Sequence, residues 1–311
     1  MNQKSRRFLA VDIFYLVMMI LPILAAITLS ILFSPASEGV EISGALIYYG
    51  EYEGALDSIT SLIITESQIN SLCVVISLIF LCLYLTHGLR TRNISKRQML
   101  AEWIVEKVEN LVTGSMGPYF AGFSAFIAAM LALSGFSSLM SLFGLYPPTS
   151  DLNVVAGWAI VAFILITYYK LKCGPLHYVK NLASPILLTP LNVIGEVATP
   201  VSMAFRHYGN VMSGAVIAVL VGTALSGLSS LLLGWLPGVL GEIPFLQIGI
   251  PAVLSVYFDL FSGCLQAYIF AMLTMMYVSD GFPYDEYMLR KERKNNNKKI
   301  KKQAMEVQKN A

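Results

Sequence analysis

Six apolar stretches of bilayer length constrain the fold of this chain more than any other feature. They lie near residues 8–33, 69–89, 119–145, 154–171, 185–233 and 246–279. A membrane-spanning helix needs about 20 mainly apolar residues, because each backbone N–H and C=O must find its partner within the segment. Hydrophobic residues make up 56% of the chain and charged residues only 13%. The sequence therefore predicts an all-α integral membrane protein with about six membrane segments.

Two of the segments have unusual lengths. Residues 185–233 are too many for one ordinary crossing, so we expect long, strongly tilted helices or a part lying in the membrane plane. Residues 8–33 follow a short basic stretch, as in a secretory signal peptide, but the apolar region of a signal peptide has only about 7–15 residues. We therefore expect residues 1–35 to form a retained membrane anchor, with a cleaved signal as the alternative.

The basic residues alternate between the connections. Residues 34–68 carry six acidic residues and no Lys or Arg, whereas residues 90–107 carry five basic residues, 170–180 carry three and 290–309 carry nine. The two other connections carry none. Because cytoplasmic loops are enriched in Lys and Arg, this pattern predicts six crossings with both termini in the cytoplasm.

Residues 95–112 have the pattern of an amphipathic helix. Leu100, Ile104, Val108 and Leu111 recur at helical spacing, with charged residues on the opposite face. Such a helix suits the cytoplasmic membrane interface. A helix packed on a soluble partner would show the same periodicity, and this alternative stays open.

Arg206 is the one basic residue inside an apolar segment, since the other 20 of the 21 Lys and Arg residues lie in the connections and near the chain ends. A guanidinium at that depth costs about 2.5–3.5 kcal/mol on insertion scales, and it cannot escape by losing its proton. Such a residue indicates an ion pathway with a negative partner nearby. An internal ion pair that serves only stability is the alternative.

Polar side chains recur at helical spacing around Arg206 and again in the last segment. Steps of three and four residues place one set on a single helix face: Glu196, Thr199, Ser202, Arg206, Asn210 and Ser213. The last segment carries a second set: Ser255, Asp259, Ser262, Gln266, Thr274 and Tyr277. Ser and Thr alone are usually packing contacts between membrane helices, but stripes that also carry ionisable groups are typical of ion pathways.

No motif in the sequence indicates a catalytic centre. There is no P-loop, no GxGxxG and no metal-ligand spacing among the three His and four Cys residues. The Cys residues are interpreted as small buried hydrophobic side chains. We predict no catalytic residue, no metal, no cofactor, no nucleotide bound directly and no nucleic-acid partner.

Three groups of residues form motifs that occur together in one known family. Arg, Gly-Asn and a further Gly are present as Arg206, Gly209, Asn210 and Gly214, preceded by Pro200 and Ser202. The last segment has Gln266, Ala267, Tyr268, Phe270 and then Tyr277. Upstream lies Tyr-Pro-Pro-Thr-x-Asp-Leu-Asn at residues 146–153. In these motifs the chain resembles subunit a of the rotary F-type ATP synthase, of the bacterial type.

This resemblance implies a non-catalytic stator subunit. The family forms two offset ion half-channels against a rotating ring of subunit c, and so couples proton or sodium flow to ATP synthesis. The c-ring and the peripheral-stalk subunit b are the implied partners, beside the lipid bilayer. Ion translocation is assigned to Arg206, Asn210, Gln266, Asp259 and Glu196. Candidates for lining the half-channels are Thr199, Ser202, Ser213, Ser262, Thr274 and Tyr277.

The chain departs from several family members at three places. Ala215 stands where they have an acid, Asp259 stands where some have His, and His207 with Tyr208 replaces an apolar and an aromatic residue. The choice between proton and sodium is expected to lie mainly in the ring, which this chain does not contain.

The resemblance also suggests a division of the chain. It begins near residue 69, which gives an anchor at 1–35, an acidic extracytoplasmic segment at 36–68, a subunit a-like membrane domain at 69–280 and a basic cytoplasmic tail at 281–311. The implied location is a bacterial plasma membrane.

Two other functions are compatible with parts of the sequence. A self-contained proton-coupled secondary transporter could use Arg206 and Asp259 as a substrate and proton pair, but such folds usually contain two matching halves, and no internal repeat is visible. A protein that only scaffolds a complex would leave the polar stripes unexplained.

Overall fold

The computed structural model describes residues 3–33, 45–49, 63–91, 94–172, 188–233 and 256–282, with residues 178, 182, 249, 253–254, 284, 287–289, 292–293 and 296 in addition. The side chains of residues 3–7, Leu233 and Asp259 lie outside the description. So do Ser255 and most of the predicted acidic segment and basic tail.

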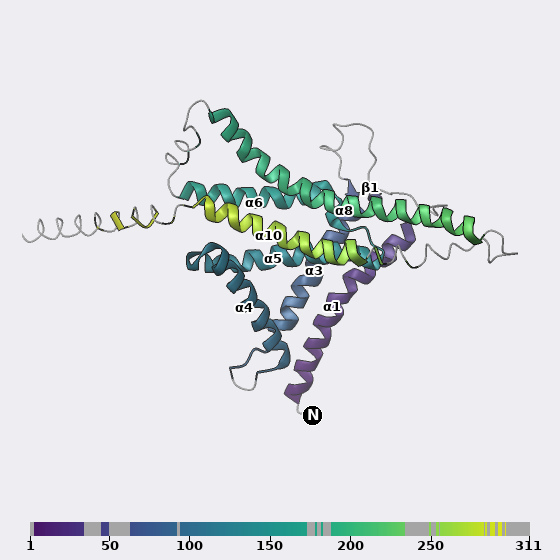
Figure 1. Cartoon of the computed structure of the whole chain (residues 1–311). Coiled ribbons are helices and arrows are strands. Elements are labelled where there is room, and N and C mark those ends of the chain that lie inside the picture. Colours follow the sequence, from purple (N-terminus) through teal and green to yellow (C-terminus); the bar gives the residue numbers. More distant parts are fainter. Residues whose placement is uncertain are drawn as a thin grey trace, which may run out of the picture.

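The membrane helices form two groups that cross one another (Figure 1). In the first group, α10 (Gly263–Asp280) packs against α5 (Ser124–Leu139), α6 (Leu152–Lys172) and α8 (Thr189–Leu233). In the second group, α1 (Gln3–Phe33) packs along α3 (Glu66–Thr86), and α3 in turn contacts α5. α10 is therefore the central helix of the first group.

Six helices within the described part of the chain are long and apolar enough to cross a membrane. The third crossing joins the 3-10 turns η1 (Pro118–Phe123) and η2 (Met140–Phe143) to the two ends of α5. The sixth joins the π-helical segment η6 (Val256–Ser262) to α10. The predicted class, an all-α integral membrane protein with six segments, is confirmed.

α8 explains the unusual length of the fifth apolar segment. Its 45 residues extend about 67 Å at 1.5 Å per residue, whereas the hydrocarbon core of a bilayer is about 30 Å thick. A helix of this length must lie strongly tilted in the membrane. α8 also runs through Pro200. Because proline has no N–H, the carbonyl of Glu196 loses its usual helical donor.

A short β-hairpin precedes α3, which the sequence analysis did not predict. β1 (Ile47–Tyr49) pairs antiparallel with β2 (Ile64–Thr65), with Ile47 opposite Thr65. The N–H of Glu66 then donates to the carbonyl of Leu46 (2.8 Å). This pairing fixes the point at which α3 begins and puts Glu66 in its first turn, where the helix dipole favours a carboxylate.

α4 (Lys96–Met116) corresponds to the predicted amphipathic helix. It begins at Ser95, whose hydroxyl accepts a hydrogen bond from the N–H of Gln98 (3.2 Å). Leu100 and Ile104 stay exposed, whereas Val112 and Met116 are buried in the main core. The first half of α4 therefore keeps an exposed apolar face, as either alternative of the sequence analysis requires, and the second half packs on the protein.

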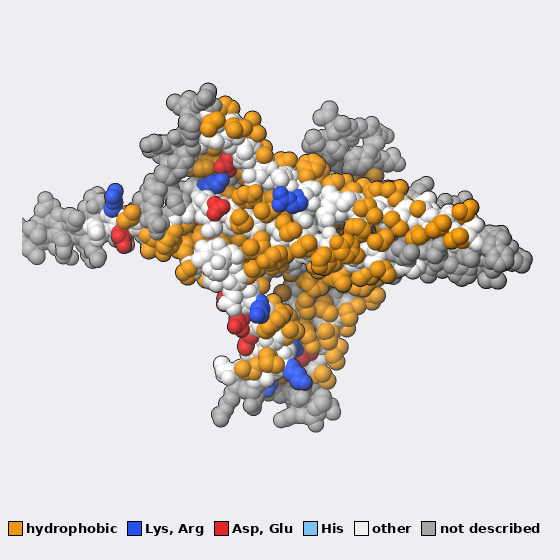
Figure 2. Space-filling view, viewed as in Figure 1, with side chains coloured by type: hydrophobic (Ala, Val, Ile, Leu, Met, Phe, Trp, Pro, Cys, Tyr) orange, Lys and Arg blue, Asp and Glu red, His pale blue; other side chains and the backbone are white. Residues whose placement is uncertain are grey.

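The main core lies where α4, α5, α6, α8 and α10 meet. Its fully buried members include Ile127, Val155, Phe270 and Met275. The outer faces are apolar as well, and hydrophobic side chains cover much of the surface over α1, α8 and α10 (Figure 2). This distribution is expected of helices whose outer faces contact lipid rather than water.

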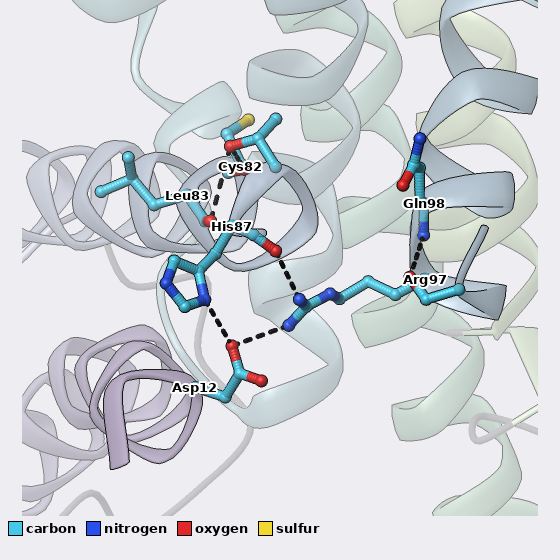
Figure 3. Close-up of polar contacts among 8 residues, drawn as sticks. Asp12, Cys82, Leu83, His87, Arg97 and Gln98 are labelled. Carbon is cyan, nitrogen blue, oxygen red and sulfur yellow. Dashed lines mark hydrogen bonds and ion pairs between the residues drawn. The ribbon is translucent and has the colours of Figure 1, made fainter. Parts of the chain in front are cut away.

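Asp12 ties α1 to the rest of the molecule (Figure 3). Its Oδ1 accepts a hydrogen bond from Arg97 Nη1 (2.8 Å) and lies 2.9 Å from His87 Nδ1. Arg97 also donates to the backbone carbonyl of His87 and lies over the ring of Tyr84. One carboxylate thus joins α1, the end of α3 and the beginning of α4, and it explains the charge within the first apolar segment.

We expect Asp12→Asn to destabilise the protein. The substitution keeps the volume but leaves the Arg97 guanidinium without its counter-charge. The asparagine oxygen can still accept a hydrogen bond from Arg97, but the charge pair is lost. Exposed ion pairs contribute about 0.2–1 kcal/mol, and the partial burial of Asp12 and Arg97 puts the effect near the upper end of that range. The thermal unfolding temperature in detergent should fall relative to Glu106→Gln, which changes an exposed acid on α4. Equal unfolding temperatures in the two variants would contradict a stabilising role for Asp12.

Candidate ion-translocation site

Arg206 lies on the outer face of α8. Its side chain is exposed, and no described residue forms a hydrogen bond or ion pair with it. Ser202 and Ser213, one and two turns away, are exposed too. The sequence predicted a negative partner near this arginine, and none of the carboxylates that the structure describes within the chain supplies one. The described carboxylates of the chain therefore leave the charge of Arg206 without a counter-charge.

His207, the next residue, is fully buried on a different face of α8. Its Nε2 lies 3.4 Å from the Ser134 hydroxyl of α5, and its ring meets Trp158 of α6 and Phe270 of α10 edge to face. Successive side chains on an α-helix point about 100° apart. The burial of His207 among three helices therefore turns Arg206 outward.

Asn210 joins α8 to the segment before α10. Its Oδ1 accepts a hydrogen bond from the Ser262 hydroxyl (2.9 Å), and its Nδ2 donates to the Ser262 carbonyl (3.4 Å). Two residues from different predicted stripes thus bind one another. The amide of Asn210 fixes the end of the π-helical segment η6, which also contains Asp259.

The backbone approaches closely at two glycines beside this contact. A Cβ at Gly214 would lie 3.1 Å from Phe258 of η6, and a Cβ at Gly263 would lie 2.7 Å from the Cβ of Ser138 on α5. Glycine is needed where elements pack this closely. Both glycines bring η6 and α10 against their neighbours at the level of the polar residues.

The pairing of α8 with η6 sets the levels of the predicted site residues. Asn210 contacts Ser262, and Gly214 contacts Phe258. The two elements therefore run antiparallel, and each step of one residue forward in α8 corresponds to one residue back in η6. Continuing this register puts Gln266 at the level of Arg206 and Asp259 about two helical turns, or about 10 Å, to one side of it. Gln266 itself is buried.

Glu196 lies on the other side of Arg206 along α8, and it is bound to a cation. Its two carboxylate oxygens accept hydrogen bonds from Lys170 Nζ, at 2.7 and 2.9 Å. Lys170 stands in the last turn of α6. The sequence analysis grouped Glu196 with Arg206 on one stripe and did not foresee that Lys170 would bind it.

The remaining predicted residues have varied surroundings. Thr199 donates to the carbonyl of Gly195, and Ser213 donates to the carbonyl of Asn210. Thr274 is fully buried, donates to the carbonyl of Phe270 and contacts the sulfur of Met130. Tyr277 is half-buried. Thr274 therefore has the surroundings of a packing residue, whereas Ser202 and Ser213 remain exposed.

A polar cluster at the start of α3 was missed by the sequence analysis. Glu66 and Asn70 are buried, with Asn70 Nδ2 donating to the carbonyl of Tyr146 (2.8 Å). Ser67 donates to Asp151 at the start of α6. Burial raises the pKa of Tyr146, and the negative charge of Asp151 adds to that rise. The Tyr-Pro-Pro-Thr-x-Asp motif was the signal available for this cluster, because it contains both Tyr146 and Asp151.

The fold and this site define a multi-pass helical membrane protein built around one outward-facing arginine. Over residues 69–279 the chain matches the family described as ATP synthase A chain. ATP synthase subunit a of Bacillus pumilus is 33% identical to it, over 60% of this chain and 79% of that protein. The Bacillus subtilis protein of the same name is 30% identical, over 63% of this chain and 85% of its own.

A sodium-specific protein is similar as well. The Propionigenium modestum protein named ATP synthase subunit a, sodium ion specific, is 33% identical over 52% of this chain and 51% of its own length. Since the family match covers well over half of the residues, this chain belongs to the ATP synthase A chain family. The resemblance stated from the motifs is confirmed. α1 and the β-hairpin lie before the matched region.

We expect Gly263→Ala to weaken the packing of α10 on α5. Alanine normally favours a helix over glycine, but here the added methyl group would collide with Ser138, and overpacking of this kind costs about 1–3 kcal/mol. The thermal unfolding temperature in detergent should fall, and it should fall less when the same substitution is made in a Ser138→Gly background. Gly227→Ala, where nothing lies within 4 Å of the new methyl group, is the control. An equal loss in both backgrounds would show that the collision is unimportant.

Proposed function

We propose that this chain is the ion-translocating stator subunit of an F-type ATP synthase, which couples proton or sodium flow across the membrane to ATP synthesis. The single observation that carries the proposal is Arg206, a permanently charged side chain that is exposed at membrane depth and unpaired among the described residues. An isolated guanidinium in that position is too costly to be kept for packing. Membership of the ATP synthase A chain family supports the same conclusion.

The partner that best fits this arginine is a rotating ring of subunit c. Each ring subunit would carry one membrane carboxyl, which crosses the lipid-facing arc neutral with its coupling ion bound. An opposite charge within a few ångströms lowers the pKa of a carboxyl by about 1–3 units. Facing Arg206, the carboxyl would therefore release its ion and pass in the charged form.

The two half-channels would lie on opposite sides of Arg206. The register of α8 and η6 puts Asp259 and Ser213 on one side, and Glu196 with Thr199 lies on the other. Asn210 and Gln266, at or near the level of Arg206, would orient the ring carboxyl by hydrogen bonds. Ser202, Ser262 and Tyr277 complete the proposed lining, and Thr274, which the sequence analysis also proposed, would pack behind it.

Arg206 would also prevent a leak between the half-channels. A fixed positive charge repels a free cation, so an ion could pass from one side to the other only on the ring. The length of α8 supports this arrangement, because a strongly tilted helix can follow the curved surface of a ring over a long path.

The same proposal covers the surroundings of the subunit. We propose subunit b of the peripheral stalk as a second partner, a bacterial plasma membrane as the location, and cytoplasmic positions for both termini because the basic connections alternate with the acidic one. In this division residues 1–35 are the anchor, residues 36–68 are extracytoplasmic, residues 69–280 are the subunit a-like membrane domain and residues 281–311 are the basic cytoplasmic tail. Family membership leaves the secondary-transporter alternative without support.

We expect Arg206→Ala to abolish ATP-driven ion uptake by inverted membrane vesicles and to open a passive leak. Arg206→Lys should restore little, because an ammonium can lose its proton when desolvated and lacks the planar fork of the guanidinium. Uptake is to be measured with both a pH-sensitive and a sodium-sensitive dye, after the soluble ATPase sector has been shown to remain bound.

Ser230→Ala provides the control for this experiment, since Ser230 is an exposed residue of α8 nearly seven turns from Arg206, bonded only to the carbonyl of Gly227 among described residues. It should pump as the wild type does. Unimpaired pumping by both Arg206 variants would refute the proposed role.

A further inference from the structure

Lys170 and Glu196 form an ion pair at one end of the polar stripe. Lys170 Nζ lies 2.7 and 2.9 Å from the two carboxylate oxygens, and each side chain keeps only 22% of its surface exposed. Both oxygens of Glu196 are therefore occupied by one ammonium group. An adjacent ammonium stabilises the charged carboxylate, so Glu196 accepts a proton or binds another cation more readily after Lys170 has moved away.

Three elements hold Lys170 in place. It extends from the last turn of α6 toward the first turns of α8, and its aliphatic stem lies under Gly281 at the end of α10. A Cβ at Gly281 would lie 2.8 Å from Lys170 Cγ, so only glycine leaves room for the stem. The pair is thus a packed contact between helices rather than a loose surface ion pair.

The other ionisable groups around Glu196 do not compete with Lys170. Tyr178, in the connection between α6 and α8, lies near Glu196, and burial together with that carboxylate raises the pKa of its phenol. Tyr277 and Asp280 are the ionisable residues in the last turn of α10. Lys172 points elsewhere, with its ammonium over the rings of Tyr119, Tyr169 and Tyr287. Among the described residues, Lys170 is the one cation bound to Glu196.

We infer that Lys170 is a positioning residue that gates the half-channel on the Glu196 side. It does so by holding the Glu196 carboxylate in the ion pair until an ion passes. This inference rests on the proposed function. When the pair is closed, the ammonium charge of Lys170 disfavours the binding of a proton or sodium ion to the carboxylate. When the pair opens, Glu196 becomes the last acid on the path between Arg206 and the aqueous side at which α6 ends.

The first experiment removes the gate and measures ion flow. Passive ion flow through the membrane sector, stripped of the soluble ATPase and reconstituted in vesicles under an imposed potential, should rise at least about twofold in Lys170→Gln, a change at the low end of coupling energies between contacting residues. Glu196→Gln should lower the flow. Lys170→Gln should then have no further effect in the Glu196→Gln background. Equal effects of Lys170→Gln in both backgrounds would overturn the gate.

A charge swap separates a gate from an ion pair that is only structural. The double variant Lys170→Glu with Glu196→Lys keeps the pair but moves the acid from α8 to α6. We expect the double variant to assemble as the wild type does but to conduct ions less well than the wild type, because the acid no longer lies on the α8 stripe. Full restoration of both would show that the pair serves packing alone. This comparison remains informative if Lys170→Gln by itself assembles poorly.

Two controls complete the design. Lys172→Gln removes a positive charge two residues away that does not contact Glu196, and it should leave ion flow unchanged. Arg206→Ala, measured in vesicles that keep the soluble ATPase bound, tests the proposed function separately. If Arg206→Ala uncouples the complex while Lys170→Gln behaves as the wild type, the gate is refuted and the stator function stands. If Arg206→Ala retains ATP-driven uptake, the stator function itself fails.

Discussion

An unpaired guanidinium at membrane depth is the constraint on which the rest of this structure depends. Arg206 cannot lose its charge, and the described part of the chain offers it no carboxylate. Under the proposed function, another molecule brings a negative charge to the same face of α8. The surrounding helices fit this arrangement, because His207 is buried among α5, α6 and α10 while Arg206 stays on the exposed face.

Much of the fold was predictable because membrane insertion imposes simple rules on sequence. Each apolar segment had to be a helix, since lipid offers no partner for a free backbone group, and the described residues contain six helices of spanning length. The unusual length of α8 also followed from the sequence. The Arg206 and Gln266 motifs indicated the family correctly. Their roles in ion translocation stay predictions until the variants are measured.

Contacts between distant helices were beyond the sequence, because helical spacing defines a face but not what it meets. Asp12 was visible as an acid in an apolar segment, yet nothing indicated that Arg97 would bind it. Glu196 shared a stripe with Arg206, but its distance from Lys170 depends on how α6 and α8 cross. The β-hairpin before α3 was missed because its strands have three and two residues, too few for a period to show.

The contacts on either side of Arg206 have a mechanical consequence. Under the proposed function, a rotor would apply a sideways force at Arg206, and a long helix would bend under that force if it were free. α8 is attached one residue later by His207 and four residues later by Asn210, each bonded to a different element. A force received at Arg206 would therefore pass into α5 and η6 within about one helical turn. The stiffness of the buried face of α8 would then limit how much of each rotational step is lost as elastic strain.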